Sequence, residues 1–139
     1  MKFIAQMLIA FALAIGGAAH PTLAGDTDPL FVNLTTDDSH RATMGITFGK
    51  NQLERGHPLT IFLNDKGVLV GSKANSARFA DHQKMLADLM GKGATVLICP
   101  MCMKQYGVKE SDLLPGLKIG NPELLSASVF KDNTKSLTW

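Results

Sequence analysis

Short hydrophobic runs alternate with longer amphipathic segments along the chain, and this alternation predicts the order of the elements. Runs rich in Val, Ile, Leu and Phe, bounded by turn-forming residues, predict β-strands at residues 30–34, 59–63, 94–98, 117–119 and 136–139. The last of these is expected to be an edge strand. The Thr and Asp residues that follow the first run favour the start of a helix.

Amphipathic patterns between the strands predict the helices. After residue 38, residues that suit a packed face recur at helical spacing, at Ala42, Ile46, Gly49 and Leu53. A second helix begins near residue 75 and presents an apolar face made by Phe79, Leu86, Leu89 and Met90. Shorter helices are expected at 100–106 and at 122–130, where Pro122 suits the first turn. Strands alternating with helices predict an α/β fold with a mostly parallel five-stranded sheet and helices on both faces.

Two further predictions concern burial. Residues 68–70 lie between Gly67 and Gly71 and are expected to form a short excursion outside the core. Met44, Met85 and Met90 occur at helical spacings, so these flexible side chains are expected to fill gaps in the core.

The first 24 residues have the pattern of a secretory signal peptide. Lys2 precedes an apolar run at residues 3–15, and small residues follow up to Ala24, after which cleavage is expected. The alternative is a retained membrane anchor, but the run is shorter than the roughly 18 to 20 residues that cross a bilayer. We therefore expect a periplasmic protein with one domain at residues 25–139 and no membrane association after cleavage.

Composition and charge exclude several classes of function. The 139-residue chain has a formal net charge of +2, and its Lys and Arg residues are scattered, which argues against nucleic-acid binding. Its two cysteines are too few for a disulfide scaffold. The sequence has no glycine-rich phosphate loop, and Asp37 and Asp38 stand where a phosphate would bind, in the expected first turn of a helix. No nucleotide, flavin or other cofactor is expected.

The two cysteines form a Cys-Pro-Met-Cys motif directly after a predicted strand. Pro100 suits the first helical position, which makes Cys99 the N-cap. Unpaired backbone N–H groups at a helix N-terminus favour the nucleophilic thiolate form of such a cysteine. Cys102 follows one turn later, within reach of a disulfide.

This motif is compatible with four interpretations. The thiols could be buried side chains or a passive local disulfide, or they could belong to a thioredoxin-like oxidoreductase. They could also bind soft Cu(I) together with Met103, whereas Met101 points away from them. A zinc site would need further ligands from His40, His57 or His82. The fourth interpretation is a cysteine that transfers sulfur.

The segment from Val96 to Asn121 resembles the active-site region of DsrE/DsrF-like proteins. In that family a strand ends in a cysteine, a short helix follows, a Gly-Val pair closes it, and a turn rich in Leu, Pro and Gly comes next, as at Gly107-Val108 and residues 112–121. The upstream strand and helix pattern fits as well. The resemblance implies a three-layer α/β/α sandwich, assembly into trimers or hexamers, and a cysteine that accepts sulfane sulfur and passes it to a partner.

Cys99 matches the family's persulfide cysteine by position, and Cys102 is an additional thiol that could resolve the persulfide. The resemblance thus implies a sulfur-transfer protein whose partners are sulfur donors and acceptors, either proteins or small compounds. His82, Lys104 and Tyr106 could assist, although a structural histidine, a surface charge and a packing residue are expected there. The alternatives that stay open are a copper-binding protein and a thiol-disulfide redox protein.

Overall fold

Five parallel strands form the central sheet, in the spatial order β4-β3-β2-β1-β5. The strands are β1 (Leu30–Leu34), β2 (Leu59–Leu63), β3 (Thr95–Ile98), β4 (Lys118–Ile119) and β5 (Lys135–Thr138). The structure is a computed structural model that describes residue 25 and residues 27–139, so the expected signal peptide lies outside the described residues. Every described pair of neighbouring strands is parallel, and β5 forms one edge as expected.

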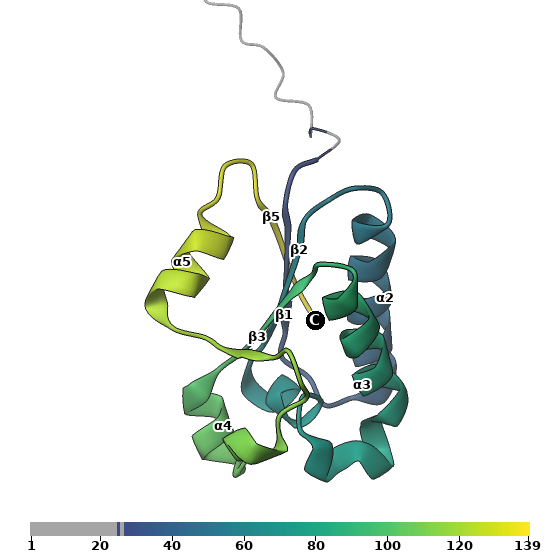
Figure 1. Cartoon of the computed structure of the whole chain (residues 1–139), viewed down its shortest axis with the longest axis vertical. Helices are drawn as coiled ribbons and strands as arrows, with labels where there is room; N and C mark the ends of the chain where they lie inside the picture. Colours follow the sequence, from purple (N-terminus) through teal and green to yellow (C-terminus); the bar gives the residue numbers. More distant parts are fainter. Residues whose placement is uncertain (1–24, 26) are drawn as a thin grey trace, which may run out of the picture.

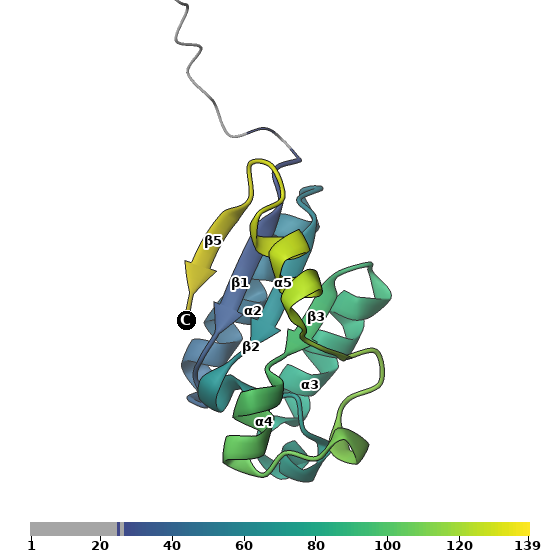
Figure 2. The same ribbon diagram turned by 90° about the vertical axis from the view of Figure 1, so that its left-hand side faces the viewer.

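Helices cover both faces of this sheet. The helices α2 (Ser39–Leu53) and α3 (Ser76–Gly91) pack on one face, and α5 (Pro122–Val129) lies on the other (Figures 1 and 2). The helix α4 (Pro100–Tyr106) is on the side of α5, next to the carboxyl ends of the strands (Figure 1). The predicted α/β/α sandwich is confirmed.

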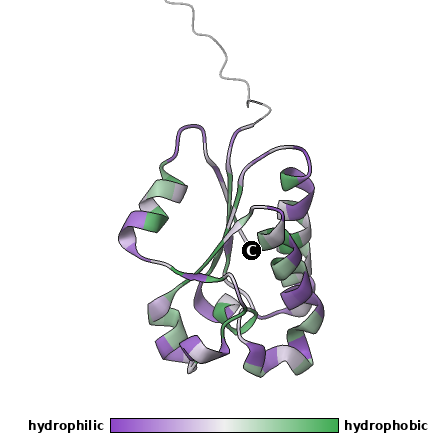
Figure 3. Ribbon diagram, viewed as in Figure 1, coloured by the Kyte–Doolittle hydropathy of each residue, from purple (hydrophilic) through white to green (hydrophobic). Residues whose placement is uncertain are grey.

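The main core lies between the sheet and the pair α2 and α3. Alternate residues of each central strand point to this side, so that Val32, Ile61 and Val96 are adjacent in register and are almost fully buried. Ile46 and Leu86 from the two helices close over them. The central strands are coloured mainly as hydrophobic in Figure 3. Burial of such side chains contributes roughly 1.5–3 kcal/mol each.

The thinner layer on the other face is formed by α5. This helix has no buried residue, and Phe130 just beyond it is 81% exposed.

Among the described residues no helix is long and apolar enough to span a membrane.

Three predictions about individual residues were wrong. Val68 and Val70 are fully buried because the 3-10 helix η1 (Asp65–Leu69) folds back onto the core. Met44 is 49% exposed and does not fill the core. Asp37 is not in the first turn of α2: Asp38 is the N-cap, its side chain accepting from the N–H of Arg41, and Asp37 lies before it.

Candidate functional site

Three neighbouring loops meet at the carboxyl edge of the sheet. Asn64 follows β2, Cys99 follows β3 and Gly120 follows β4. The backbone N–H of each residue donates to the last carbonyl of the adjacent strand: Asn64 to Leu34, Cys99 to Leu63 and Gly120 to Ile98, at 2.8–3.0 Å. The sheet ladder therefore fixes where these three residues lie. In parallel sheets this edge is where ligands are usually bound.

Cys99 caps the helix that follows it, as predicted. Its Sγ accepts a hydrogen bond from the backbone N–H of Cys102 at 3.3 Å, and Pro100 occupies the first helical position. The helix ends at Gly107, whose φ of 69° is in the left-handed region that glycine adopts without strain. This short helix is therefore capped at both ends, which stabilises the segment that carries the motif.

The two thiols are free and in contact. The Sγ atoms of Cys99 and Cys102 are 2.8 Å apart. Cys102 Sγ is also 3.0 Å from Asn64 Oδ1 and accepts a hydrogen bond from the backbone N–H of Asp65 at 3.2 Å. The single thiol proton of Cys102 can thus be donated either to Cys99 or to Asn64. Donation to Cys99 stabilises negative charge on the sulfur of Cys99.

Burial raises the pKa of the Cys102 thiol, and the neighbouring sulfur of Cys99 raises it further. The N–H of Asp65 acts in the opposite direction, because it donates to Cys102 Sγ and favours the thiolate. Burial is the largest of these effects, and the pKa of the Cys102 thiol is raised overall.

Tyr106 joins the site through Asp65. Its hydroxyl donates a hydrogen bond to the Asp65 carboxylate, which connects α4 to the loop after β2. This hydrogen bond raises the pKa of Tyr106, and the charge of Asp65 raises it further. Asp65 itself has a φ of 45°, a conformation that is uncommon outside glycine. The predicted role of Tyr106 in packing was therefore incomplete.

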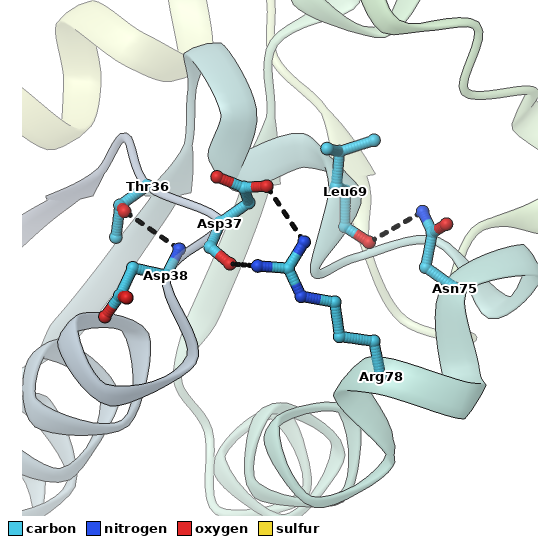
Figure 4. Close-up of polar contacts among 6 residues, drawn as sticks. All are labelled: Thr36, Asp37, Asp38, Leu69, Asn75 and Arg78. Atoms are coloured by element: carbon cyan, nitrogen blue, oxygen red, sulfur yellow. Dashed lines mark hydrogen bonds and ion pairs between the residues drawn. The ribbon is translucent and has the colours of Figure 1, made fainter.

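A second loop brings another carboxylate close to Tyr106. Asp37 contributes to the raised pKa of the Tyr106 phenol through its negative charge. Figure 4 shows Arg78, from the start of α3, reaching Asp37, with 3.0 Å between its Nη1 and the carboxylate. Both groups are partly exposed, so the pair contributes about 0–1 kcal/mol. Its main effect is to hold this loop in place.

A cavity of about 420 Å³ opens beside Cys99 and is bounded by residues from three loops and from α4 and α5. Cys99 lines this cavity, but Cys102 is not among the described residues that do. The two thiols thus have different surroundings: Cys99 faces the cavity, while Cys102 faces Asn64 and Asp65. A slightly larger cavity of about 470 Å³ lies between α2 and α3, and its lining includes neither cysteine.

Other candidates from the sequence lie apart from the thiols or are engaged elsewhere. His82 is buried on α3, where its Nε2 is 2.8 Å from the carbonyl oxygen of Ser39, so it is structural. Lys104 is exposed on α4. Met103, the proposed third copper ligand, is 5% exposed and packs in the hydrophobic core. Within the described part of the chain, no three His, Cys, Asp or Glu side chains are grouped to hold a metal ion.

Sequence reasoning did not identify Asn64 and Asp65 as part of the site. They were assigned to a turn, because nothing local distinguishes them from other turn residues. The signal that could have found them is topological: residues that follow adjacent parallel strands lie at one edge of the sheet. To apply this signal, one must already know that β2 and β3 are neighbours in the sheet.

Comparisons with known proteins agree with this architecture. The profile of the DsrE/DsrF-like family matches residues 30–135. An uncharacterized protein of Methanocaldococcus jannaschii, MJ0989, is 33% identical over 90 residues, which cover 64% of this chain and 79% of the relative. The ychN protein from E. coli has a similar structure, with a TM-score of 0.66 and 20% identity over 81% of this chain and 99% of its own. MTH1491, a protein of unknown function from Methanobacterium thermoautotrophicum, has a TM-score of 0.67 at 14% identity with the same coverage. Both structural likenesses show the fold.

Proposed function

Because the chain belongs to the DsrE/DsrF-like family, which is associated with sulfur relay, we propose that it carries sulfane sulfur as a persulfide on Cys99. The observation that supports this most is the difference between the two thiols. Cys99 lines a cavity, whereas Cys102, the more exposed of the two thiols, is not among the described residues of that lining, and the two Sγ atoms are 2.8 Å apart. A sulfur compound in the cavity would therefore reach Cys99 first.

Loading of the site is a thiolate exchange without net oxidation. The Cys99 thiolate attacks the outer sulfur of a persulfide R–S–SH, the S–S bond of the donor breaks, and R–S⁻ leaves. The product is Cys99–S–SH. The thiol proton of Cys102 stabilises the attacking sulfur before the reaction, and an acceptor thiolate can later remove the outer sulfur in the same way.

Cys102 provides a second route by which the persulfide is discharged. Its thiolate attacks Cys99 Sγ, the bond to the outer sulfur breaks, and HS⁻ leaves while a Cys99–Cys102 disulfide forms. The persulfide is reduced to sulfide, and the two thiols are oxidised. The raised pKa of Cys102 slows this step near neutral pH, which protects the persulfide until an acceptor arrives.

The test is to incubate the reduced protein with a sulfane-sulfur donor and to measure the intact mass. Addition of one sulfur atom to the wild-type protein supports the proposal, and Cys99→Ser should abolish it. Cys102→Ser is the matched control, because it retains Cys99 and should hold the added sulfur longer. If Cys102→Ser takes up no sulfur while the wild type is oxidised to a disulfide, the result would instead support a thiol-disulfide redox protein. No adduct combined with tight binding of Cu(I) would support the copper alternative.

The native context of this activity is also part of the proposal. The protein is exported to the periplasm by cleavage after Ala24, which the N-terminal sequence of the protein recovered from that compartment would test. A homo-oligomer, a trimer or hexamer, is part of the proposal, and Phe130, which is 81% exposed, is the residue chosen to probe an interface. Phe130→Lys should lower the mass measured by light scattering if Phe130 is in the interface.

A further inference from the structure

The cavity beside Cys99 has a distinctly apolar lining. The apolar residues that line it are Phe62 from β2, Pro100 and Met101 from α4, and Pro122 and Leu125 from α5. Among the described residues that line it, none is an acidic or basic residue, and Cys99 is the one ionisable side chain. Its volume of about 420 Å³ is in the range of pockets for small molecules. The lining therefore favours a small ligand with little charge.

The side-chain oxygens of the two asparagines in the lining are already engaged. The Oδ1 of Asn121 accepts from the N–H of Leu124 at 2.8 Å, because Asn121 caps α5. The Oδ1 of Asn64 accepts from the N–H of Asp65 at 2.9 Å and lies 3.0 Å from Cys102 Sγ. A charged ligand would lose its hydration in this cavity and would meet two neutral side-chain amides but no side chain of opposite charge, which is unfavourable.

Two helices begin at the cavity, and helix N-termini ordinarily attract anions. Here both start with a proline, Pro100 in α4 and Pro122 in α5, so each lacks one of the N–H groups that an anion would bind. In each helix a further N–H is taken by the cap, Cys99 Sγ or Asn121 Oδ1. In addition, Glu123 carries negative charge in the first turn of α5. An anionic ligand is therefore disfavoured.

On these grounds we propose that the sulfur donor of Cys99 is a small persulfide with an apolar, uncharged organic group, bound in the cavity between α4 and α5. This inference rests on the proposed sulfur-carrier function and specifies its donor. The organic group packs against Phe62 and Leu125, and the outer sulfur of the donor meets Cys99 Sγ. The Cys99 thiolate takes that sulfur, and the organic thiolate R–S⁻ leaves and is protonated by solvent.

The experiment compares ethyl persulfide with glutathione persulfide, each prepared from sulfide and the matching disulfide. Glutathione persulfide has the same reacting S–SH group but carries two carboxylates and one ammonium group, so its organic part is a net anion. Sulfur loading is followed by intact mass in the Cys102→Ser variant, in which the persulfide accumulates. Each rate is divided by the rate of the same donor with N-acetylcysteine, which removes the intrinsic difference in reactivity. We expect the ethyl donor to be preferred by about tenfold, equivalent to ~1.4 kcal/mol.

Two substitutions in α5 provide the matched pair. Leu125→Lys places a cation in the cavity, so it should reduce loading from the ethyl donor and increase loading from glutathione persulfide. Leu124→Lys makes the same change on the neighbouring residue, which is 37% exposed and is not among the described residues that line the cavity. It should leave the preference unchanged. If Leu125→Lys lowers the loading rates from ethyl persulfide and from glutathione persulfide by the same factor, its effect is only structural, and the inference is overturned.

The outcomes separate this inference from the proposed function. Equal normalised rates with both donors, or a preference for glutathione persulfide, would overturn the apolar donor while leaving Cys99 as a sulfur carrier. If neither donor loads Cys99, both proposals fail. A preference for the ethyl donor that Leu125→Lys reverses supports both.

Discussion

The hydroxyl of Tyr106 donates a hydrogen bond to the carboxylate of Asp65, and the backbone N–H of Asp65 donates in turn to Cys102 Sγ. Tyr106, at the end of α4, thereby positions the Asp65 N–H that donates to Cys102, near the start of the same helix. This donor is the one contact that favours the thiolate of Cys102 against burial. Under the proposed function, the pair would influence how readily Cys102 attacks a persulfide on Cys99.

Tyr106→Phe should slow the release of sulfide from the persulfidated protein. Without the hydroxyl, Asp65 loses its anchor, its N–H contacts Cys102 Sγ less well, and the pKa of Cys102 rises further. Loss of one hydrogen bond of about 0.5–1.5 kcal/mol corresponds to roughly a 2- to 10-fold slower release. The rate can be followed with a sulfide-selective electrode. An unchanged rate, with folding intact by circular dichroism, would mean that Tyr106 does not position Asp65.

Asp65→Asn should have the opposite effect on sulfide release. The amide keeps an acceptor for Tyr106 and tolerates the left-handed backbone conformation at this position, but it removes the charge that helps to raise the pKa of Cys102. Sulfide release should be a few-fold faster. The same change should lower the pKa of Tyr106, which is the only tyrosine of the chain and can be titrated by its ultraviolet absorbance. A tyrosine pKa that does not fall would contradict the contact.

The rate at which the persulfide releases sulfide should increase with pH. Only the thiolate of Cys102 attacks, and its pKa is raised by burial, so sulfide release should keep accelerating above the ordinary cysteine value of about 8.5. Cys102→Ser should remove this dependence. The free energy of unfolding should also depend on this thiol. Because the pKa of Cys102 is higher in the folded than in the unfolded protein, its protonated form stabilises the fold at pH values below the unfolded pKa, and this stabilisation is lost as the pH rises through the folded pKa. A release rate that levels off below pH 8 would argue against a raised pKa.

The parts of this protein that the sequence could predict are those that depend on local rules. The order of strands and helices, Cys99 as the N-cap, Pro100 at the first turn and Gly107 at the helix end follow from hydrophobic pattern and helix-capping preferences. These rules involve residues only a few positions apart. They gave the motif its place in the fold, at the carboxyl end of the third strand.

The parts that the sequence could not predict depend on contacts between distant residues. Asp65 and Tyr106 are 41 positions apart and meet only because β2 and β3 are neighbours. Residues 68–70 were placed outside the core because two glycines flank them. In fact Gly67 allows η1 to approach the end of β1 closely, and Val68 is buried as a result.

That close approach leads to a prediction about stability. A Cβ at Gly67 would lie 2.0 Å from the carbonyl oxygen of Leu34, a backbone atom that cannot move away without disturbing β1. Gly67→Ala should therefore reduce the free energy of unfolding by about 3 kcal/mol. Because η1 begins with Asp65, the substitution should also disturb the contacts of Cys102.

Gly91→Ala is the matched control for this substitution. Gly91 is the last residue of α3, and a Cβ there would meet nothing within 4 Å. Replacing glycine by alanine in a helix reduces the entropy of the unfolded chain, so a gain of roughly 0.5–1 kcal/mol is expected. Urea denaturation of both variants provides the comparison. If Gly67→Ala were as stable as Gly91→Ala, η1 would not be held against β1, and the position of Asp65 beside Cys102 would need another cause.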